Sequence, residues 1–100
     1  MARTTVRMKI HYDANYVANT INSILLANKY KFKTVRNETI WSKGDGVFLK
    51  QSCFAYWFQE GDLFVQAWVY DALVGESDVS GIVVLKKKMR SMLDEIQRLV

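Results

Sequence analysis

The sequence predicts a two-layer α+β domain, in which two helices cover one face of a mainly antiparallel sheet. Three observations carry this prediction. Several segments alternate apolar and polar residues with a period of two, which is typical of half-buried strands. Two other segments repeat apolar residues at helical spacing. The strands in the middle of the chain follow one another through connections short enough for hairpins, so the sheet is expected to be antiparallel.

The chain has 100 residues, of which 50% are hydrophobic and 24% are charged. These proportions are typical of globular domains and exclude disordered, collagen-like and coiled-coil chains. A chain of this length is near the most common domain size and can bury a core without disulfides or metal. We therefore predict a single domain over residues 1–100.

The first strand is predicted from residue 5 onward, because Val6, Met8 and Ile10 alternate with polar residues. Asp13 then stands where the N-cap of a helix belongs. Residues 14–27 repeat apolar side chains at helical spacing and are predicted to form the first helix.

A series of strands is predicted to follow the first helix. The predicted strands span residues 30–36, 39–43, 47–58 and 63–71, with turns at 37–38, 44–46 and 59–62. Gly44-Asp45-Gly46 is a strong hairpin signal, in which one glycine is expected to have a positive φ. Trp41, just before this turn, is expected to be buried.

The end of the chain is predicted as a loop over 72–80, a short strand over 81–85 and a helix over 86–100. Met89, Met92 and Ile96 fall at the spacing of one helical face. The helix residues expected to pack against the sheet are Val17, Ile21, Ile24, Met92, Leu93 and Ile96.

Charge is distributed unevenly along the chain. The formal net charge is +4, but the first 50 residues carry nine basic and three acidic residues, and residues 51–85 contain no Lys or Arg. Nucleic-acid binding is therefore disfavoured, because phosphate contacts dominate such affinity. No signal peptide or membrane-spanning segment is expected, and the lone cysteine fits a reducing compartment, so a cytoplasmic location is predicted.

No catalytic residue, metal ligand or cofactor motif is predicted. A nucleophilic enzyme would have to use the single histidine, His11, and the single cysteine, Cys53, which lies in an apolar run typical of a buried residue. One His and one Cys cannot form a structural zinc site. Asp71, Glu76 and Asp78 provide too few oxygen ligands for calcium and are expected in a solvated loop.

The predicted strand over 63–71 is apolar on both faces. Phe64, Gln66, Trp68 and Tyr70 share the face opposite the helices, where an open sheet normally shows polar residues. Either this second face is covered within the chain, or it binds a partner, a ligand or a second copy. The first hypothesis is therefore a non-catalytic interaction domain that self-associates or binds a protein through this candidate surface.

The alternative hypothesis is a module that binds a small molecule or an anion. In it the aromatic face forms the pocket, and the basic cluster Lys86, Lys87, Lys88 and Arg90 anchors the anion. The same cluster would attract an acidic membrane surface only weakly. It is also compatible with a simple solvated start of the last helix.

Two resemblances accompany these hypotheses. The predicted element order is similar to that of the TATA-box-binding-protein-like fold. Glu38, Trp41, Lys43, Gly44 and Gly46 form the string Glu-x-x-Trp-x-Lys-Gly-x-Gly. This string resembles an uncharacterised domain of Gram-positive bacterial proteins that is often attached to a zinc ribbon or a membrane segment. The resemblance implies a domain that belongs to, or stands apart from, a larger membrane-attached protein.

Overall fold

The computed structural model describes residues 3–44, 50–81 and 83–100. Its elements follow the predicted order, strand, helix, five strands, helix, and the fold is α+β with an antiparallel sheet. The elements are β1 (Thr4–Lys9), α1 (Ala14–Ala27), β2 (Lys31–Val35), β3 (Glu38–Gly44), β4 (Lys50–Gln59), β5 (Asp62–Asp71), β6 (Gly75–Ser77) and α2 (Val84–Leu99).

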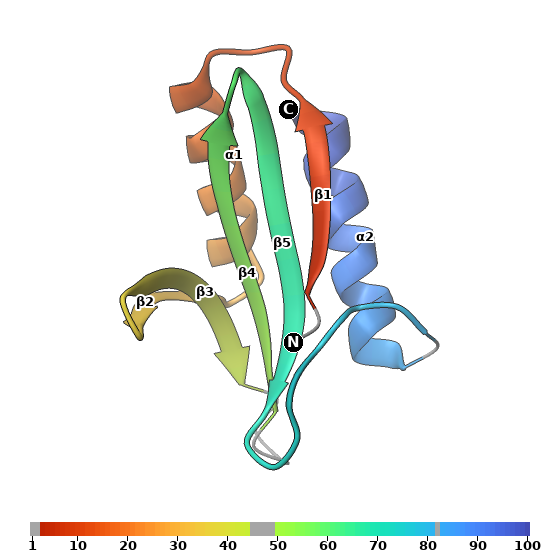
Figure 1. Cartoon of the computed structure of the whole chain (residues 1–100). Coiled ribbons are helices and arrows are strands. Elements are labelled where there is room, and N and C mark those ends of the chain that lie inside the picture. Colours follow the sequence, from red (N-terminus) through yellow and green to blue (C-terminus); the bar gives the residue numbers. More distant parts are fainter. Residues whose placement is uncertain (1–2, 45–49, 82) are drawn as a thin grey trace.

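The long hairpin of β4 and β5 forms the centre of the sheet (Figure 1). The strand order is β1-β5-β4-β3-β2, and β6 pairs with the end of β5 beyond the segment that β1 covers. In β5, apolar side chains on one face alternate with aromatic and polar ones on the other, as the period of two requires. The two faces of β5 therefore have separate environments.

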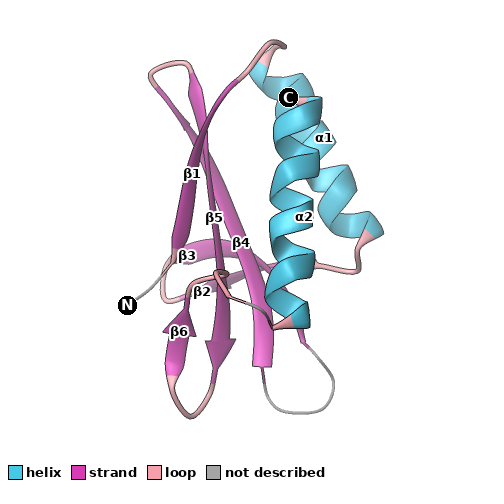
Figure 2. Ribbon diagram, turned by 90° about the vertical axis from the view of Figure 1, so that its right-hand side faces the viewer, coloured by secondary structure: helices cyan, strands magenta, loops and turns pink. Residues whose placement is uncertain are grey.

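Both helices lie on the same face of the sheet, as the sequence predicts (Figure 2). The Asp13 carboxylate accepts hydrogen bonds from the backbone N–H groups of Asn15 and Tyr16, which fixes the start of α1. The predicted helix residues Val17, Ile21, Met92, Leu93 and Ile96 are buried, and Ile24 is partly buried against the same core. Trp41, only 7% exposed, completes this core from β3.

The β2–β3 hairpin leaves the plane of the sheet (Figure 1). Residues 41–44 of β3 pair with β4, whereas residues 38–40 pair only with β2 among the described residues. The outer part of the hairpin is thereby free to bend toward the face that the helices leave open. This bend brings Ile40 against β4 and β5 on that second face.

The predicted strand over residues 81–85 is wrong. Val84 and Leu85 begin α2, two residues earlier than predicted, and Leu85 packs against the core; Ile82 lies outside the described residues. The last strand is instead β6, within the predicted loop. A short run of β-branched residues does not distinguish a strand from the start of a buried helix, which explains the error.

The turns differ slightly from the predicted ones. The β2–β3 turn consists of Arg36 and Asn37, one residue earlier than predicted, and both have positive φ angles of 51° and 65°. The β4–β5 turn consists of Glu60 and Gly61, inside the predicted range. Gly44 is the last residue of β3, and the rest of the predicted turn, Asp45-Gly46, lies outside the described residues.

Candidate functional site

The second face of the sheet carries a small hydrophobic cluster of its own. Trp68 of β5 packs there with Cys53 and Ala55 of β4 and with Ile40 of the bent hairpin. Trp68 is only 2% exposed. At this point the second face is therefore covered within the chain, and the Trp68 ring is not available to a partner.

Arg3 closes this cluster from the solvent side. Its guanidinium carbon lies 3.6 Å from the centroid of the Trp68 ring. The guanidinium donates paired hydrogen bonds to Glu38 (2.7 and 3.0 Å) and to Glu76 (2.9 and 2.7 Å), and a further one to Gln66 (3.2 Å). Charge-assisted, bidentate contacts of this kind fix geometry as well as charge. Arg3 thus ties the start of β1 to β3, β5 and β6.

Opposite charges stabilise one another in this network. Hydrogen bonds to Glu76 and Glu38 raise the pKa of Arg3 despite its partial burial. In turn, the hydrogen bonds from Arg3 lower the pKa of Glu76. One guanidinium between two carboxylates carries a net charge of −1, which the basic residues nearby offset.

A groove of about 390 Å³ opens beside this network on the second face. Trp68 and Cys53 contribute to its floor. Val35 of β2 and Tyr70 of β5 line it from two strands that β3 and β4 separate in the sheet. Lys33 and Arg36 of the β2–β3 hairpin also line it, and the Lys33 ammonium donates a hydrogen bond to Gln51 (3.1 Å). The groove thus has an apolar floor, and its borders carry Lys33, Arg36 and the charged residues of the Arg3 network, Glu38 and Glu76 included.

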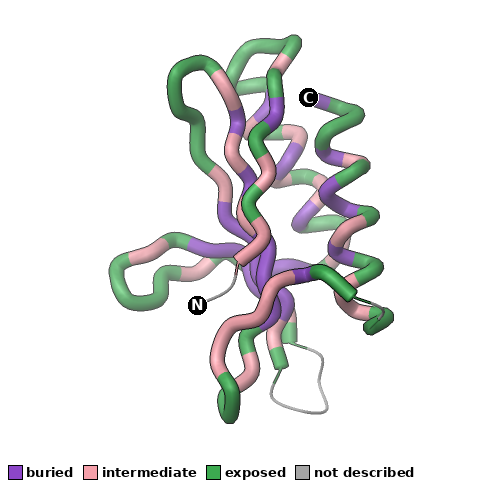
Figure 3. The backbone as a smooth tube through the Cα atoms, turned by 45° about the vertical axis from the view of Figure 1, so that its right-hand side comes forward, coloured by how far each residue is buried: buried purple, intermediate pink, exposed green. Residues whose placement is uncertain are grey.

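The hairpin of β5 and β6 ends in an exposed apolar tip next to this groove. Leu73 and Val74 are 89% and 81% exposed, and Figure 3 shows this tip in green at the lower end of the molecule. The backbone N–H of Leu73 donates to the Asp71 carboxylate (2.8 Å), which shapes the turn. The two side chains form a small exposed apolar patch at the tip of the hairpin.

The structure separates the four residues of the predicted aromatic face. Tyr70 lines the groove and is exposed, whereas Trp68 is buried beneath Arg3. Gln66 is held by Arg3 and donates to the Thr5 hydroxyl.

Phe64 lies outside the groove. It stacks on Trp57 with ring centroids 5.5 Å apart and an interplanar angle of 5°. The Arg7 guanidinium lies over the same ring, 5.7 Å from its centroid. The predicted face is therefore not one continuous exposed aromatic surface, because polar groups held by Arg3 divide it.

The predicted basic cluster belongs to the other face of the molecule. Lys86, Lys87, Lys88 and Arg90 lie on α2, which packs on the helical face, so they cannot share a pocket with Trp68 and Tyr70. Arg90 is used by the fold, because its guanidinium donates to the carbonyl oxygens of Val79 and Gly81 (2.6 and 2.8 Å). The structure therefore does not bring the aromatic face and this cluster together in one pocket.

The two residues that a nucleophilic enzyme would need lie at different ends of the sheet. Cys53 is buried opposite Trp68, and burial raises the pKa of its thiol to about 11. His11 is exposed just beyond the end of β1. That end pairs with the first residue of β5, so His11 lies near the β4–β5 turn. Among residues 3–44, 50–81 and 83–100, no three His, Cys, Asp or Glu side chains are placed to hold a metal ion.

Sequence reasoning missed Arg3, Glu38 and Glu76 as a unit, because their contacts join segments far apart in the chain. Leu73 and Val74 carried a usable signal, since two apolar residues in a predicted loop stand out. No helix in the described part of the chain is long and apolar enough to cross a membrane.

Comparisons of the chain with family models, curated proteins and solved structures gave no match. The site is therefore interpreted from its own residues. Within the string that resembles the Gram-positive domain, Glu38 binds Arg3 and Trp41 lies in the core. The structural contacts of these two residues explain their presence, without requiring that the chain share a function with that domain.

Proposed function

We propose that the protein is a non-catalytic interaction domain that associates with a second copy of itself through the second face of its sheet. The observation that carries the proposal is the presence of a groove with an apolar floor and an exposed apolar tip, Leu73-Val74, side by side on one surface. The tip of each copy occupies the groove of the other.

The position of the tip supports a reciprocal contact. Tyr70 and Glu76 pair with each other at the base of the β5–β6 hairpin and both line the groove. The tip follows only three residues after Tyr70. In a two-fold dimer the same patch must serve on both copies, so the inserting and the receiving parts have to be neighbours.

The inserting tip and the receiving groove have complementary chemistry. Leu73 and Val74 are aliphatic, and burying each fully would contribute about 1.5–3 kcal/mol before the cost of association is subtracted. Asp71 lies at the start of the tip, whereas Lys33 and Arg36 border the groove, and the acidic lining residues Glu38 and Glu76 are both hydrogen-bonded to Arg3. An acidic residue on the inserting part would thus meet basic residues on the receiving part. Because each copy inserts only two aliphatic side chains, the contact is small, and a weak, reversible dimer is expected.

Sedimentation equilibrium from low micromolar to near-millimolar concentration tests the proposal. We expect the mean mass to rise toward that of a dimer, and the double substitution L73S/V74S to abolish the rise. Because both side chains are exposed, the variant keeps its fold. The matched control is L26S on α1, which removes an equally aliphatic, exposed side chain far from the groove and should leave association unchanged.

Two results would contradict the proposal. One is a monomer at every concentration. The other is a dimer that L26S weakens as much as L73S/V74S does, because association would then use general surface hydrophobicity and not this face. Added salt should weaken the dimer moderately, because it screens the attraction between Asp71 of one copy and Lys33 and Arg36 of the other.

A further inference from the structure

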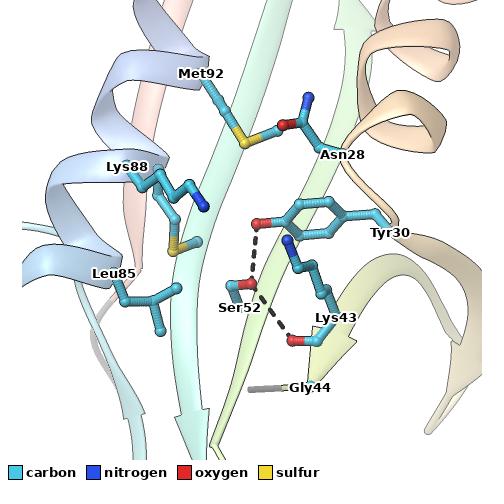
Figure 4. Close-up of a pocket in the computed structure, with 9 residues that line it drawn as sticks. Asn28, Tyr30, Lys43, Gly44, Ser52, Leu85, Lys88 and Met92 are labelled. Atoms are coloured by element: carbon cyan, nitrogen blue, oxygen red, sulfur yellow. Dashed lines mark hydrogen bonds between the residues drawn. The ribbon is translucent and has the colours of Figure 1, made fainter. Parts of the chain in front are cut away.

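A second cavity lies on the helical face of the sheet, away from the groove. Its volume is about 150 Å³, and it is formed between the first half of α2, the β3 and β4 strands and the segment that follows α1. A cavity of this size can hold one benzene ring. Figure 4 shows the side chains that line it.

Two ammonium groups face the cavity from two different elements. Lys88 extends from α2 toward the Tyr30 hydroxyl, and Lys43 extends from β3 toward the Tyr30 ring (Figure 4). The Lys43 ammonium lies 5.6 Å from the centroid of the Tyr30 ring. None of the ion pairs among the described residues involves Lys43 or Lys88, and the described lining residues include no Asp or Glu.

The hydroxyl groups at the base of the cavity are already engaged. Tyr30 donates to the Ser52 hydroxyl (2.9 Å), which in turn donates to the carbonyl oxygen of Lys43 (3.4 Å). Burial raises the pKa of Tyr30, so the phenol stays neutral at pH 7. The base of the cavity therefore adds no negative charge, and the two ammonium groups dominate its electrostatics.

Apart from Lys88, the α2 side of the cavity is apolar. It consists of Leu85, Met89 and Met92 on α2, and Met89 is fully buried. Methionine side chains are flexible and polarizable, which suits a surface that must adapt to a ligand. A molecule that fits this cavity must combine a compact anionic group with a small apolar one.

We propose that this cavity binds a small phosphate monoester. A phosphate monoester carries a charge of about −1.5 to −2 at pH 7, which matches two ammonium groups better than a single carboxylate does. Its oxygens lie between the Nζ atoms of Lys43 and Lys88, and its organic group contacts Leu85 and Met92, next to the buried Met89. The phosphate is carried either by a soluble molecule or by a lipid headgroup, since the recognition chemistry is the same.

Methyl NMR of the methionines measures binding with phenyl phosphate as the probe. The chain has four methionines, of which Met89 and Met92 line the cavity and Met8 of β1 is buried in the core. We expect the Met89 and Met92 methyl signals to shift on titration while Met8 stays unchanged. No shift of these signals up to high millimolar phenyl phosphate would overturn the proposal.

The variants K43Q and K88Q test the two ammonium groups. Each should weaken phenyl phosphate binding about tenfold, the usual effect of removing one charge-assisted hydrogen bond. The control is K87Q, because Lys87 is a neighbouring, exposed lysine of α2 that does not line the cavity, and it should change the affinity less than twofold. Equal effects of all three substitutions would indicate general charge attraction and overturn the assignment.

Vesicles with and without phosphatidic acid identify the source of the phosphate. Binding to phosphatidic acid vesicles that K43Q and K88Q abolish, but K87Q does not, assigns the cavity to a lipid phosphate. Binding of phenyl phosphate without such vesicle binding assigns it to a soluble monoester. Vesicle binding that all three variants weaken equally, with no shift of Met89 or Met92, contradicts a cavity site.

Discussion

The guanidinium of Arg3 lies flat over the indole of Trp68, with 3.6 Å between its central carbon and the ring centroid. Trp68 is buried for this reason, although it lies on the face of the sheet opposite α1 and α2. The arginine is held there by Glu38 and Glu76, which belong to two different hairpins. A charged side chain thus closes a hydrophobic cluster, and its cost of desolvation is offset by two carboxylates and a cation–π contact.

Replacing Trp68 with Ser should therefore destabilise the domain and not merely remove a surface contact. Removing a buried tryptophan typically costs about 3–5 kcal/mol. We expect a large loss in the urea midpoint of unfolding, measured by circular dichroism. Tyr70→Ser, on the same face of β5 but 38% exposed, is the control and should cost much less. Equal stability of the two variants would mean that Arg3 does not seal the cluster.

The same network predicts a pH dependence. The Arg3 hydrogen bonds lower the pKa of Glu76 in the folded protein below its value of about 4.3 in the unfolded chain. Glu76 therefore contributes stability that is fully present above the unfolded pKa and is lost as pH falls through the folded pKa. Unfolding midpoints between pH 7 and pH 3 should decline less in Glu76→Gln than in the unchanged protein. The control, Glu95→Gln on α2, should follow the unchanged protein's pH profile.

Local patterns in the sequence predict most of this fold because most of its elements have a clear period. The stripe of α1 with its Asp13 cap, and the alternation of β5, each specify both an element and the face it buries. The last strand was misplaced because β6 has three residues, too few to show a period, while Val83-Val84-Leu85 imitates a strand.

The candidate site was harder to predict from sequence. Alternation correctly places Trp68 and Tyr70 on the second face, but it carries no information on what covers each of them. Burial of Trp68 depends on Arg3, 65 residues earlier, and on the bend of the β2–β3 hairpin. Contacts at such separations leave no local signal, so the extent of coverage becomes visible only in three dimensions.

Cys53 should be chemically inert in the folded domain. Burial raises the pKa of its thiol to about 11, so roughly one molecule in a thousand carries the reactive thiolate at pH 8. Reaction with a disulfide reagent should therefore be slow in native buffer and fast in urea. Because the chain has one cysteine, the absorbance of the thiol that the reagent releases measures the reaction of Cys53 alone. Rapid, complete reaction under native conditions would contradict the burial of this cluster.

The β4–β5 turn offers a test of backbone conformation. Glu60 and Gly61 both have positive φ angles, 53° and 80°, in a two-residue connection between Gln59 and Asp62. Hairpin turns of this kind favour Asn followed by Gly, because Asn tolerates a positive φ better than Glu does. Glu60→Asn should therefore stabilise the domain by up to about 1 kcal/mol, whereas Gly61→Ala should destabilise it by about 1 kcal/mol.

Nothing lies within 4 Å of the position that a Cβ at Gly61 would occupy, so steric contact does not contribute to the expected loss. The two substitutions thus isolate backbone preference at adjacent positions of one turn. Urea unfolding monitored by tryptophan fluorescence measures both, and the slopes should agree because the surface exposed on unfolding is the same. If Glu60→Asn lowered the midpoint, or Gly61→Ala left it unchanged, the left-handed conformation of this turn would be refuted.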